Sequence, residues 1–484
     1  MIRRVVKVLA VLVGVLVVLA VWGWFVLRPP MLAVPRQGRL VFTNVTVVNP
    51  GRDRQTAQTL TVEGDHIATL TATASDTRAT ENTAQLSGRY VLPGLIDMHV
   101  HHMPPDTMLY GLLFLAHGVT TVRDTGDFSG QILQQRRQLQ EGGYPGPRLF
   151  ACGPIIDADP PWWPGSRAVR TEAEARAVVA ELAGAEVDCI KVYWRLSGEL
   201  LAAIRAAATE HHLPVVGHIP LAVPFEQAHL TDIQHLTGVP VFTPDPNSTR
   251  TTQFAAWAAA WHGLDDARID MIVRTSVEQG LLHTPTLVVW AQMGRQREYL
   301  TRRDSSAAQL LPRWYREVFW HPRDEFLPAF DDLGHALPQM KMVVRRLYQA
   351  GVRMHVGSDT PNPFVVPGAG LQEEMALWVD AGLSPEEVWV AATRWAGETL
   401  GVPKLGTVQE GAPADFLLFR DDPTLDLHAL STLEAVVTQG RLYPKSVLDD
   451  ALRQQQAYFN GWFYDHLSMA YARWIAARMR TDEP

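Results

Sequence analysis

Short apolar segments alternate with amphipathic helical stretches between about residue 93 and residue 402, and this alternation constrains the fold more than any other feature. The apolar segments are brief, bounded by turn or helix signals, and often rich in β-branched residues, so we interpret them as buried strands. Amphipathic stretches such as residues 171–185 and 198–211 lie between them. Strands that are joined through helices run parallel, so the pattern predicts an α/β fold with crossover helices.

Several of these predicted strands carry a polar side chain near their C-terminal end. The run VLPGLIDMHVH (residues 91–101) carries His99 and His101, and a spacing of two places both side chains on one face of a strand. Two imidazoles on one face suit a metal ion such as zinc. Active sites form at this end of the strands in barrels of alternating strands and helices. The later strands end in single polar groups, namely Lys191, His218, His235 and Asp359.

Lys191 is unusual because lysine is rare in this chain. The five lysines are Lys7, Lys191, Lys341, Lys404 and Lys445, and arginine supplies nearly all other positive charge. A neutral lysine amine can add carbon dioxide to give a carbamate, an anionic oxygen ligand that can bridge two metals, whereas a guanidinium stays protonated. The residues alone leave a second interpretation open, in which the lysine pairs with a buried carboxylate.

The ordered set His-x-His, Lys, His, His, Asp resembles the amidohydrolase superfamily of metal-dependent hydrolases. The segments LPGLIDMHVH (residues 92–101) and HGVTTVRD (residues 117–124) resemble its first two barrel strands. AATRWAGETLG (residues 391–401) and GAPADFLL (residues 411–418) resemble the helix and the closing strand after the barrel. The resemblance covers roughly residues 38–445. It is strongest to the branch that contains imidazolonepropionase-like proteins and membrane or secreted Xaa-Pro-type dipeptidases.

The resemblance implies a (β/α)8 TIM barrel over residues 93–402. The barrel would be inserted in a small β-sandwich domain that both chain ends form, from residues 38–92 and 403–445. Alternating segments at residues 40–48, 59–63 and 66–70 agree with strands in that domain. Residues 446–484 would form a C-terminal helical tail.

The resemblance also implies a binuclear metal site. His99, His101 and Asp359 would hold one divalent ion, and His218 and His235 would hold the second. Lys191, carbamylated by carbon dioxide, would bridge the two ions, which we expect to be zinc. Two such ions lower the pKa of a shared hydroxide. Asp359 would take the hydroxide proton and pass it to the leaving group.

Such a site predicts hydrolysis of a C–N bond in a small amide or dipeptide-like substrate. Two alternatives stay open: an esterase or lactonase that uses the same site, and a membrane-tethered binding protein without catalysis. Asp97 shares the predicted strand face of the two first histidines, so we expect it to orient one of their rings, with a purely structural role as the alternative. Tyr193, two residues after Lys191, is a candidate substrate contact.

Residues 1–30 predict an N-terminal transmembrane helix. Residues 1–7 are basic, and residues 8–27 form an apolar run long enough to span a bilayer. The positive charges favour a cytoplasmic N-terminus, which would place the catalytic domain of this single-pass protein on the periplasmic or extracytoplasmic side. The alternative is a cleavable signal peptide, but Trp22 and Trp24 lie beyond the weak cleavage site at residues 18–20.

Composition restricts the remaining possibilities. The formal charge is −8 and no basic patch is present, which argues against a nucleic-acid partner. The two cysteines, Cys152 and Cys189, do not predict a disulfide framework, and we interpret Cys189 as a small buried residue near the site. The aromatic tail over residues 446–480 either docks on the body or lies on the membrane surface. The oligomeric state stays open.

Overall fold

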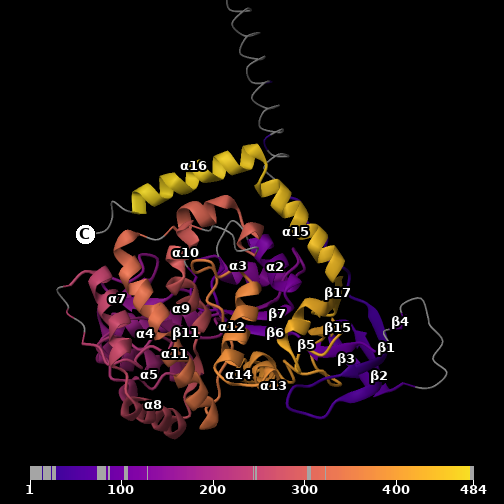
Figure 1. The fold of residues 1–484 in the computed structure, drawn as a ribbon, viewed down its shortest axis with the longest axis horizontal. Coiled ribbons are helices and arrows are strands. Elements are labelled where there is room, and N and C mark those ends of the chain that lie inside the picture. Colours follow the sequence, from indigo (N-terminus) through magenta and orange to yellow (C-terminus); the bar gives the residue numbers. More distant parts are fainter. Residues whose placement is uncertain are drawn as a thin grey trace, which may run out of the picture.

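The computed structural model describes residues 14, 23, 29–73, 83–85, 88–102, 107–127, 129–243, 245, 248–301, 307–321 and 323–479. The apolar run that predicts a membrane anchor lies outside these residues apart from two glycines. Within the described residues, no helix is long and apolar enough to cross a membrane. The described chain has an α/β fold with parallel-strand sheets, as predicted (Figure 1).

Both ends of the body contribute strands to one eight-stranded sheet with the order β17-β16-β15-β5-β1-β2-β3 and β4 beside β1. The N-terminal strands are β1 (Arg39–Val47), β2 (Gln55–Glu63), β3 (His66–Ala72), β4 (Thr83–Gln85) and β5 (Tyr90–Pro93). The C-terminal strands are β15 (Phe416–Phe419), β16 (Leu433–Thr438) and β17 (Arg441–Pro444). Antiparallel pairing of β5 with β15 joins the two ends of the chain. In the core of this sheet the rings of Phe42 and Phe416 meet edge to face at 5.5 Å.

The remaining strands pair in parallel. A three-stranded sheet contains β6 (Leu95–Val100), β7 (Val119–Asp124) and β8 (Arg148–Ala151). A six-stranded sheet has the order β10-β9-β11-β12-β13-β14. Its strands are β9 (Ile156–Ala158), β10 (Arg167–Val169), β11 (Ile190–Val192), β12 (Val215–Gly217), β13 (Asp232–Gln234) and β14 (Leu282–Thr284).

Backbone contacts connect the two parallel sheets at both edges. At one edge Asp188 N donates to Ala151 O at 2.8 Å, which joins the end of β8 to the chain entering β11. At the other edge, residues 354–360 lie between β14 and β6, with parallel bridges from Met354 to His283 and from Thr360 to Val100. The two parallel sheets are therefore held side by side, and the predicted histidine and lysine ligands lie at or near the C-terminal ends of their strands.

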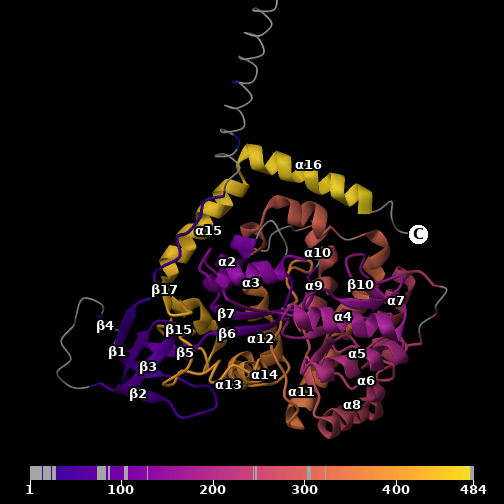
Figure 2. The same ribbon diagram turned by 180° about the vertical axis from the view of Figure 1, so that it is seen from behind.

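Helices separate the parallel strands and cover their outer side (Figures 1 and 2). They are α2 (Thr107–Ala116), α3 (Ile132–Gln140), α4 (Glu172–Gly184), α5 (Gly198–Glu210), α6 (Phe225–Ala228), α7 (Arg250–Ala259), α8 (Asp266–Gln279), α9 (Leu287–Gly294), α10 (Gln296–Thr301), α11 (Leu327–Gln349), α12 (Ala369–Asp380), α13 (Pro385–Val390) and α14 (Ala396–Thr399). Short 3-10 or π turns are η1 (Ala260–Gly263), η2 (Ala308–Leu310), η3 (Tyr315–Phe319), η4 (Asp324–Phe326), η5 (Ala391–Trp395) and η6 (Leu427–Thr432).

Local sequence explains how such a helix begins and which side it buries. Helix α4 starts after Thr171, whose side chain accepts a hydrogen bond from Glu174 N. Acidic residues in its first turn also interact favourably with the positive end of the helix dipole. Its buried residues are Ala175, Val178, Val179 and Leu182, which is the spacing of one helix face.

Two helices end the described chain. Helix α15 (Lys445–Phe459) packs against α2, β16 and β17, and α16 (Trp462–Met479) runs along the outside of the molecule (Figure 2). These two helices make up most of the described part of residues 446–484.

The structure contains a disulfide that the sequence did not predict. Cys152 and Cys189 are bonded to each other and are buried beside Val216. Cys152 follows β8 and Cys189 precedes β11, and the hydrogen bond from Asp188 to Ala151 brings these two segments together. The disulfide therefore links the end of β8 to the start of β11, two residues before Lys191.

Removing this disulfide is expected to destabilise the fold. The bonded residues are 37 apart in the sequence, and closing a loop of that size stabilises a protein by about 2–4 kcal/mol. Replacing both cysteines with alanine should therefore lower the midpoint of urea unfolding, and dithiothreitol should shift the native protein in the same direction but leave the variant unchanged. An equal response of both proteins to dithiothreitol would show that no disulfide forms.

Candidate metal centre

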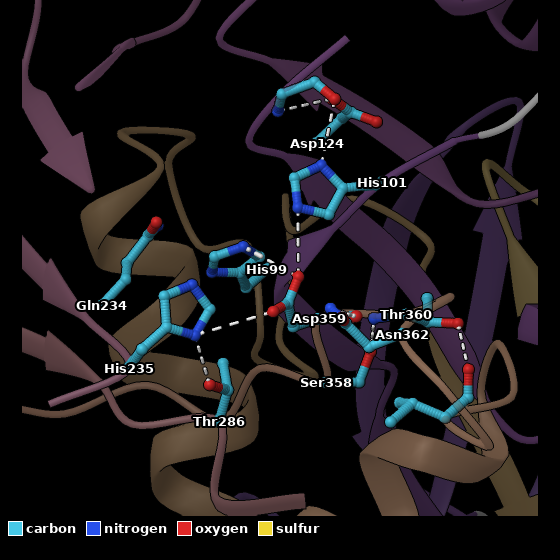
Figure 3. Close-up of polar contacts among 12 residues, drawn as sticks. His99, His101, Asp124, Gln234, His235, Thr286, Ser358, Asp359, Thr360 and Asn362 are labelled. Carbon is cyan, nitrogen blue, oxygen red and sulfur yellow. Dashed lines mark hydrogen bonds and ion pairs between the residues drawn. The ribbon is translucent and has the colours of Figure 1, made fainter. Parts of the chain in front are cut away.

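Four of the six predicted ligands lie together, with three histidines around the carboxylate of Asp359 (Figure 3). Asp359 Oδ1 lies 3.2 Å from His99 Nε2 and 3.0 Å from His101 Nε2. Asp359 Oδ2 lies 3.6 Å from His235 Nδ1. His99 lies on β6 and His235 directly follows β13. Asp359 lies in residues 354–360, which pair with β14 on one side and with β6 on the other. The prediction that the ends of separate strands bring these groups together thus matches the geometry.

The other two predicted ligands lie next to this group. The ring of His218, which follows β12, lies 4.5 Å from the ring of His235 between centroids. Lys191, on β11, is buried, and its Nζ donates a hydrogen bond to Gln234 Oε1. The described structure therefore pairs the lysine with a neutral carboxamide, not with the carboxylate that the second interpretation of the sequence requires.

Backbone conformation explains how adjacent residues reach the same site. His235 and Asp359 have φ values of 60° and 56°, in the left-handed region that non-glycine residues seldom adopt. In a regular strand the side chains of Gln234 and His235 would point to opposite faces. The left-handed turn at His235 ends that alternation, so both residues serve the site. Such strain persists where the surrounding structure enforces it, and it concentrates at functional sites.

Neighbouring groups hold the imidazole rings in place. Thr286 Oγ1 lies 2.7 Å from His235 Nδ1, and the Gly126 carbonyl oxygen lies 3.0 Å from His101 Nδ1. A Cβ at Gly126 would lie within 3.0 Å of His101 and Ile155, so this close approach requires glycine. No pattern in the sequence identifies Thr286, because it lies far from every predicted ligand along the chain.

The expectation that Asp97 orients an imidazole is wrong. Its carboxylate accepts hydrogen bonds from Ser358 N at 2.9 Å and Ser358 Oγ at 2.6 Å, and from the backbone N of His99 at 3.2 Å. Asp97 therefore connects the backbone at His99 with the backbone at Ser358, which directly precedes Asp359. Burial raises the pKa of Asp97 to about 7, although its hydrogen bonds to Ser358 oppose that shift.

Burial controls the charge of the imidazoles. It lowers the pKa of His235 to about 3 and holds the pKa values of His99 and His218 well below the ordinary value, so these rings are neutral near pH 7. Burial alone would raise the pKa of Asp359, but His99 and His235 outweigh it and hold that pKa well below its usual range. Burial would lower the pKa of His101, but its contact with Asp359 outweighs burial and raises that pKa. His99, His218 and His235 thus present neutral imidazole nitrogens near an ionised carboxylate, the forms that bind metal ions.

Unsatisfied buried atoms test whether these residues fit a metal ion. Within the described part of the chain, both ring nitrogens of His99, Nδ1 of His218 and Oδ1 of Asp359 are buried without a hydrogen bond. Possible ligand atoms of His99, His235 and Asp359 lie within 4.8 Å of one another. Buried polar atoms are normally satisfied, so this cluster fits divalent ions that accept nitrogen and oxygen ligands. The cluster contains predicted ligands of both ions, so the two predicted positions adjoin.

Aromatic side chains form a wall on the His218 side of the centre. The rings of Tyr193 and His218 lie 4.1 Å apart between centroids, and Trp163 Nε1 donates to Tyr193 Oη at 2.7 Å. Trp194 lies 4.7 Å from Trp162 and 5.3 Å from Trp257 between centroids. We refer to Trp162, Trp163, Tyr193, Trp194 and Trp257 as the aromatic wall.

Comparisons with known proteins place the chain in a family. The amidohydrolase family profile matches residues 90–443. A curated relative, the imidazolonepropionase of Photorhabdus laumondii subsp. laumondii, is 39% identical over 83 residues. That match spans 17% of this chain and 20% of the relative, so it covers about a fifth of either protein.

Solved structures share the fold. A bottromycin amidohydrolase has a TM-score of 0.70 at 24% identity, over 88% of this chain and 91% of that one. A putative prolidase from Bifidobacterium longum has a TM-score of 0.63 at 24% identity, over 87% and 100%. A Xaa-Pro dipeptidase with methionine in its active site has a TM-score of 0.62 at 19% identity, over 84% and 100%. With the family profile matching most of its length, the chain belongs to the amidohydrolase family of hydrolases.

Proposed function

We propose that this chain is a binuclear metal-dependent amidohydrolase that hydrolyses the C–N bond of a small amide or dipeptide-like substrate. The observation that carries the proposal is the buried Asp359 carboxylate, which lies 3.0–3.6 Å from ring nitrogens of three histidines at strand ends. The contacts between successive strands, including residues 354–360 between β14 and β6, support a closed (β/α)8 barrel that builds this site.

Two divalent ions, which we expect to be zinc, fit the unsatisfied atoms of the centre. The residues that would hold them are His99, His101, His218, His235 and Asp359, with carbamylated Lys191 as the bridge. When bound, the ions supply Lewis acidity and a nucleophilic water at neutral pH. Asp359 is ionised at that pH and is placed to accept a proton at its carboxylate and return it to the leaving nitrogen.

Lys191 is prepared for carbamylation by its surroundings. Burial lowers its pKa to about 7, so a large fraction of the amine is neutral near that pH. Only the neutral amine can form a bond to the carbon of carbon dioxide, and it loses one proton as the carbamate forms. Gly217 leaves space beside it, because a Cβ there would lie 3.0 Å from Lys191 Cδ and 2.3 Å from Val192 O.

Gln234 supports the modified lysine in this proposal. Its Oε1 accepts the hydrogen bond from Lys191, and its Nε2 is buried without a hydrogen-bond partner among the described residues. A carbamate presents one N–H donor beside an anionic oxygen acceptor. The carboxamide of Gln234 has the matching acceptor and donor, so it can make both hydrogen bonds at once.

Replacing Gln234 with leucine should reduce carbamate formation, because leucine has a similar size but supplies neither hydrogen bond. We expect the carbamate signal in ¹³C NMR after labelling with ¹³C-bicarbonate to fall, and metal affinity to drop by about 10-fold, as for other groups that support metal ligands. Gln372→Leu is the matched control, because Gln372 donates to the His117 carbonyl outside the centre. An unchanged carbamate signal in the Gln234 variant would exclude this role.

The location of the enzyme is also part of the proposal. The apolar run of residues 8–27 would anchor the protein in a membrane as a single span, with the catalytic domain on the periplasmic or extracytoplasmic side. The disulfide between Cys152 and Cys189 supports that side, because disulfides persist in oxidising compartments and are rare in the cytosol.

The substrate would carry an apolar group. The aromatic wall lies beside His218, and its Trp163 is 41% exposed, so an apolar group of a bound substrate would contact this side of the centre. Two structural neighbours are described as a putative prolidase and a Xaa-Pro dipeptidase, which makes dipeptides the first class to assay.

A hydrolysis screen tests the proposed function. Zinc-loaded protein should contain about two ions per chain by metal analysis. We expect it to hydrolyse dipeptides or N-acyl amino acids that carry apolar side chains. Hydrolysis of lactones or esters alone would favour the alternative chemistry at the same site. No hydrolysis of any class by fully loaded protein would favour a binding protein.

A further inference from the structure

Helices α15 and α16 differ in how they pack. Helix α15 buries Leu448, Leu452 and Phe459 against the body. In α16, Met469 is the one buried residue between positions 462 and 477, the part of the helix whose burial the structure describes. Hydrophobic packing therefore explains the position of α15 but accounts for little of α16.

The polarity of α16 is reversed compared with a helix on a soluble protein. Its one acidic residue, Asp465, faces inward and pairs with Arg313 at 2.7 Å. The exposed residues occupy about half of the helix circumference, since they recur at the helical period. They include large apolar side chains with high exposed fractions, namely Trp462 (74%), Tyr471 (61%), Leu467 (51%) and Trp474 (50%). His466 and Arg473 are the basic residues among the described residues of this exposed face.

The start of the described body lies close to this helix. Gln455 Nε2, buried on α15, donates a hydrogen bond to the Pro30 carbonyl. Pro30 follows the apolar run of residues 8–27 by three positions, and Gln455 precedes α16 by seven. Figures 1 and 2 show α16 continuing from α15 as the outermost described element on this side of the molecule. The point where the chain would leave a membrane is thus held near α16.

We propose that the exposed face of α16 lies in the headgroup region of the bilayer that the N-terminal segment enters. This inference rests on the membrane location in the proposed function. Tryptophan and tyrosine favour the membrane interface, and a helix with an aromatic face lies along that interface. Arg473, without an acidic residue on the same face, suits anionic lipid headgroups.

Fluorescent labelling of the full-length chain tests this placement. The two native cysteines are bonded and buried, so a single introduced cysteine can carry an environment-sensitive dye. Leu467→Cys and Tyr471→Cys place the dye on the exposed face of α16. Val277→Cys, on α8, is the matched control, since Val277 is 53% exposed on another helix.

The labelled proteins are reconstituted in vesicles of phosphatidylcholine and phosphatidylglycerol that contain a lipid-borne nitroxide quencher. We expect dyes at positions 467 and 471 to shift to shorter emission wavelengths and to lose roughly half of their intensity to the quencher. The dye at position 277 should show neither change. Equal behaviour at all three positions would overturn the proposal.

Three controls separate the possible failures. One alternative result is an emission shift in detergent without vesicles, as large as in vesicles at high protein concentration and smaller on dilution. That result would identify a second copy as the occupant of the α16 face and overturn the proposal. Another is that the protein floats with the vesicles although the dyes at positions 467 and 471 are not quenched. That result would reject the contact of α16 with the membrane but would still support the proposed N-terminal anchor. Hydrolysis measured in the same preparations reports on the proposed activity independently of both results.

Discussion

Replacing Asp359 with asparagine is expected to lower kcat/KM by about 10³-fold, the size of effect seen when a general base is lost. Asparagine keeps the size of the side chain but removes its negative charge and its ability to accept a proton. The three histidines that lie 3.0–3.6 Å from the carboxylate would lose their anionic partner. Steady-state hydrolysis and metal analysis on the same preparation measure both consequences.

Asp415→Asn is the matched control for the loss of a buried carboxylate. Asp415 pairs with Arg148 and accepts hydrogen bonds from Thr438 Oγ1 and Gln439 N beside β15 in the eight-stranded sheet. That substitution should lower the free energy of unfolding but leave kcat/KM of the folded protein near the native value. If Asp359→Asn retained activity within a few-fold of native, Asp359 would be a structural carboxylate.

The sequence was sufficient to predict the parallel α/β fold, because the alternation of strands and helices appears directly in the pattern of apolar residues. It also identified the side chains that meet at the strand ends. Strand parity was less reliable within the site. It placed Asp97 beside the imidazoles, whereas its carboxylate turns to Ser358. Strand parity would also place Gln234 and His235 on opposite faces, because no sequence pattern shows the left-handed φ of His235.

The disulfide shows a second limit of sequence reasoning. Two cysteines give no pairing pattern, and 37 positions separate them. They meet because the chain passes through β9, β10 and α4 and then returns beside β8, where Asp188 N donates a hydrogen bond to Ala151 O. Contacts of this kind depend on strand order, which periodicity does not determine. The signal for Gln234 was present, since it directly precedes a predicted ligand, but its role depends on the geometry of Lys191.

Replacing Lys191 with alanine is expected to abolish hydrolysis and to lower the metal content below about two ions per chain. The variant would remove the proposed bridging oxygens together with the side chain, and it would leave a space next to Gly217. Short carboxylic acids should restore part of the activity, because a free carboxylate in that space supplies the missing anionic oxygens. The ¹³C carbamate signal should disappear. Lys341→Ala, which removes a surface pair with Asp380, should change none of these readouts.

A second substitution distinguishes the carbamate from a lysine that acts only through its positive charge. Arginine at position 191 keeps the charge and can still donate to Gln234 Oε1, but it does not form a stable carbamate because its guanidinium stays protonated. If the positive charge were sufficient, Lys191→Arg would retain activity and metal while Lys191→Ala would lose both. If the carbamate is required, both variants lose activity, and carboxylic acids rescue only the alanine variant, because arginine fills the space that they would occupy.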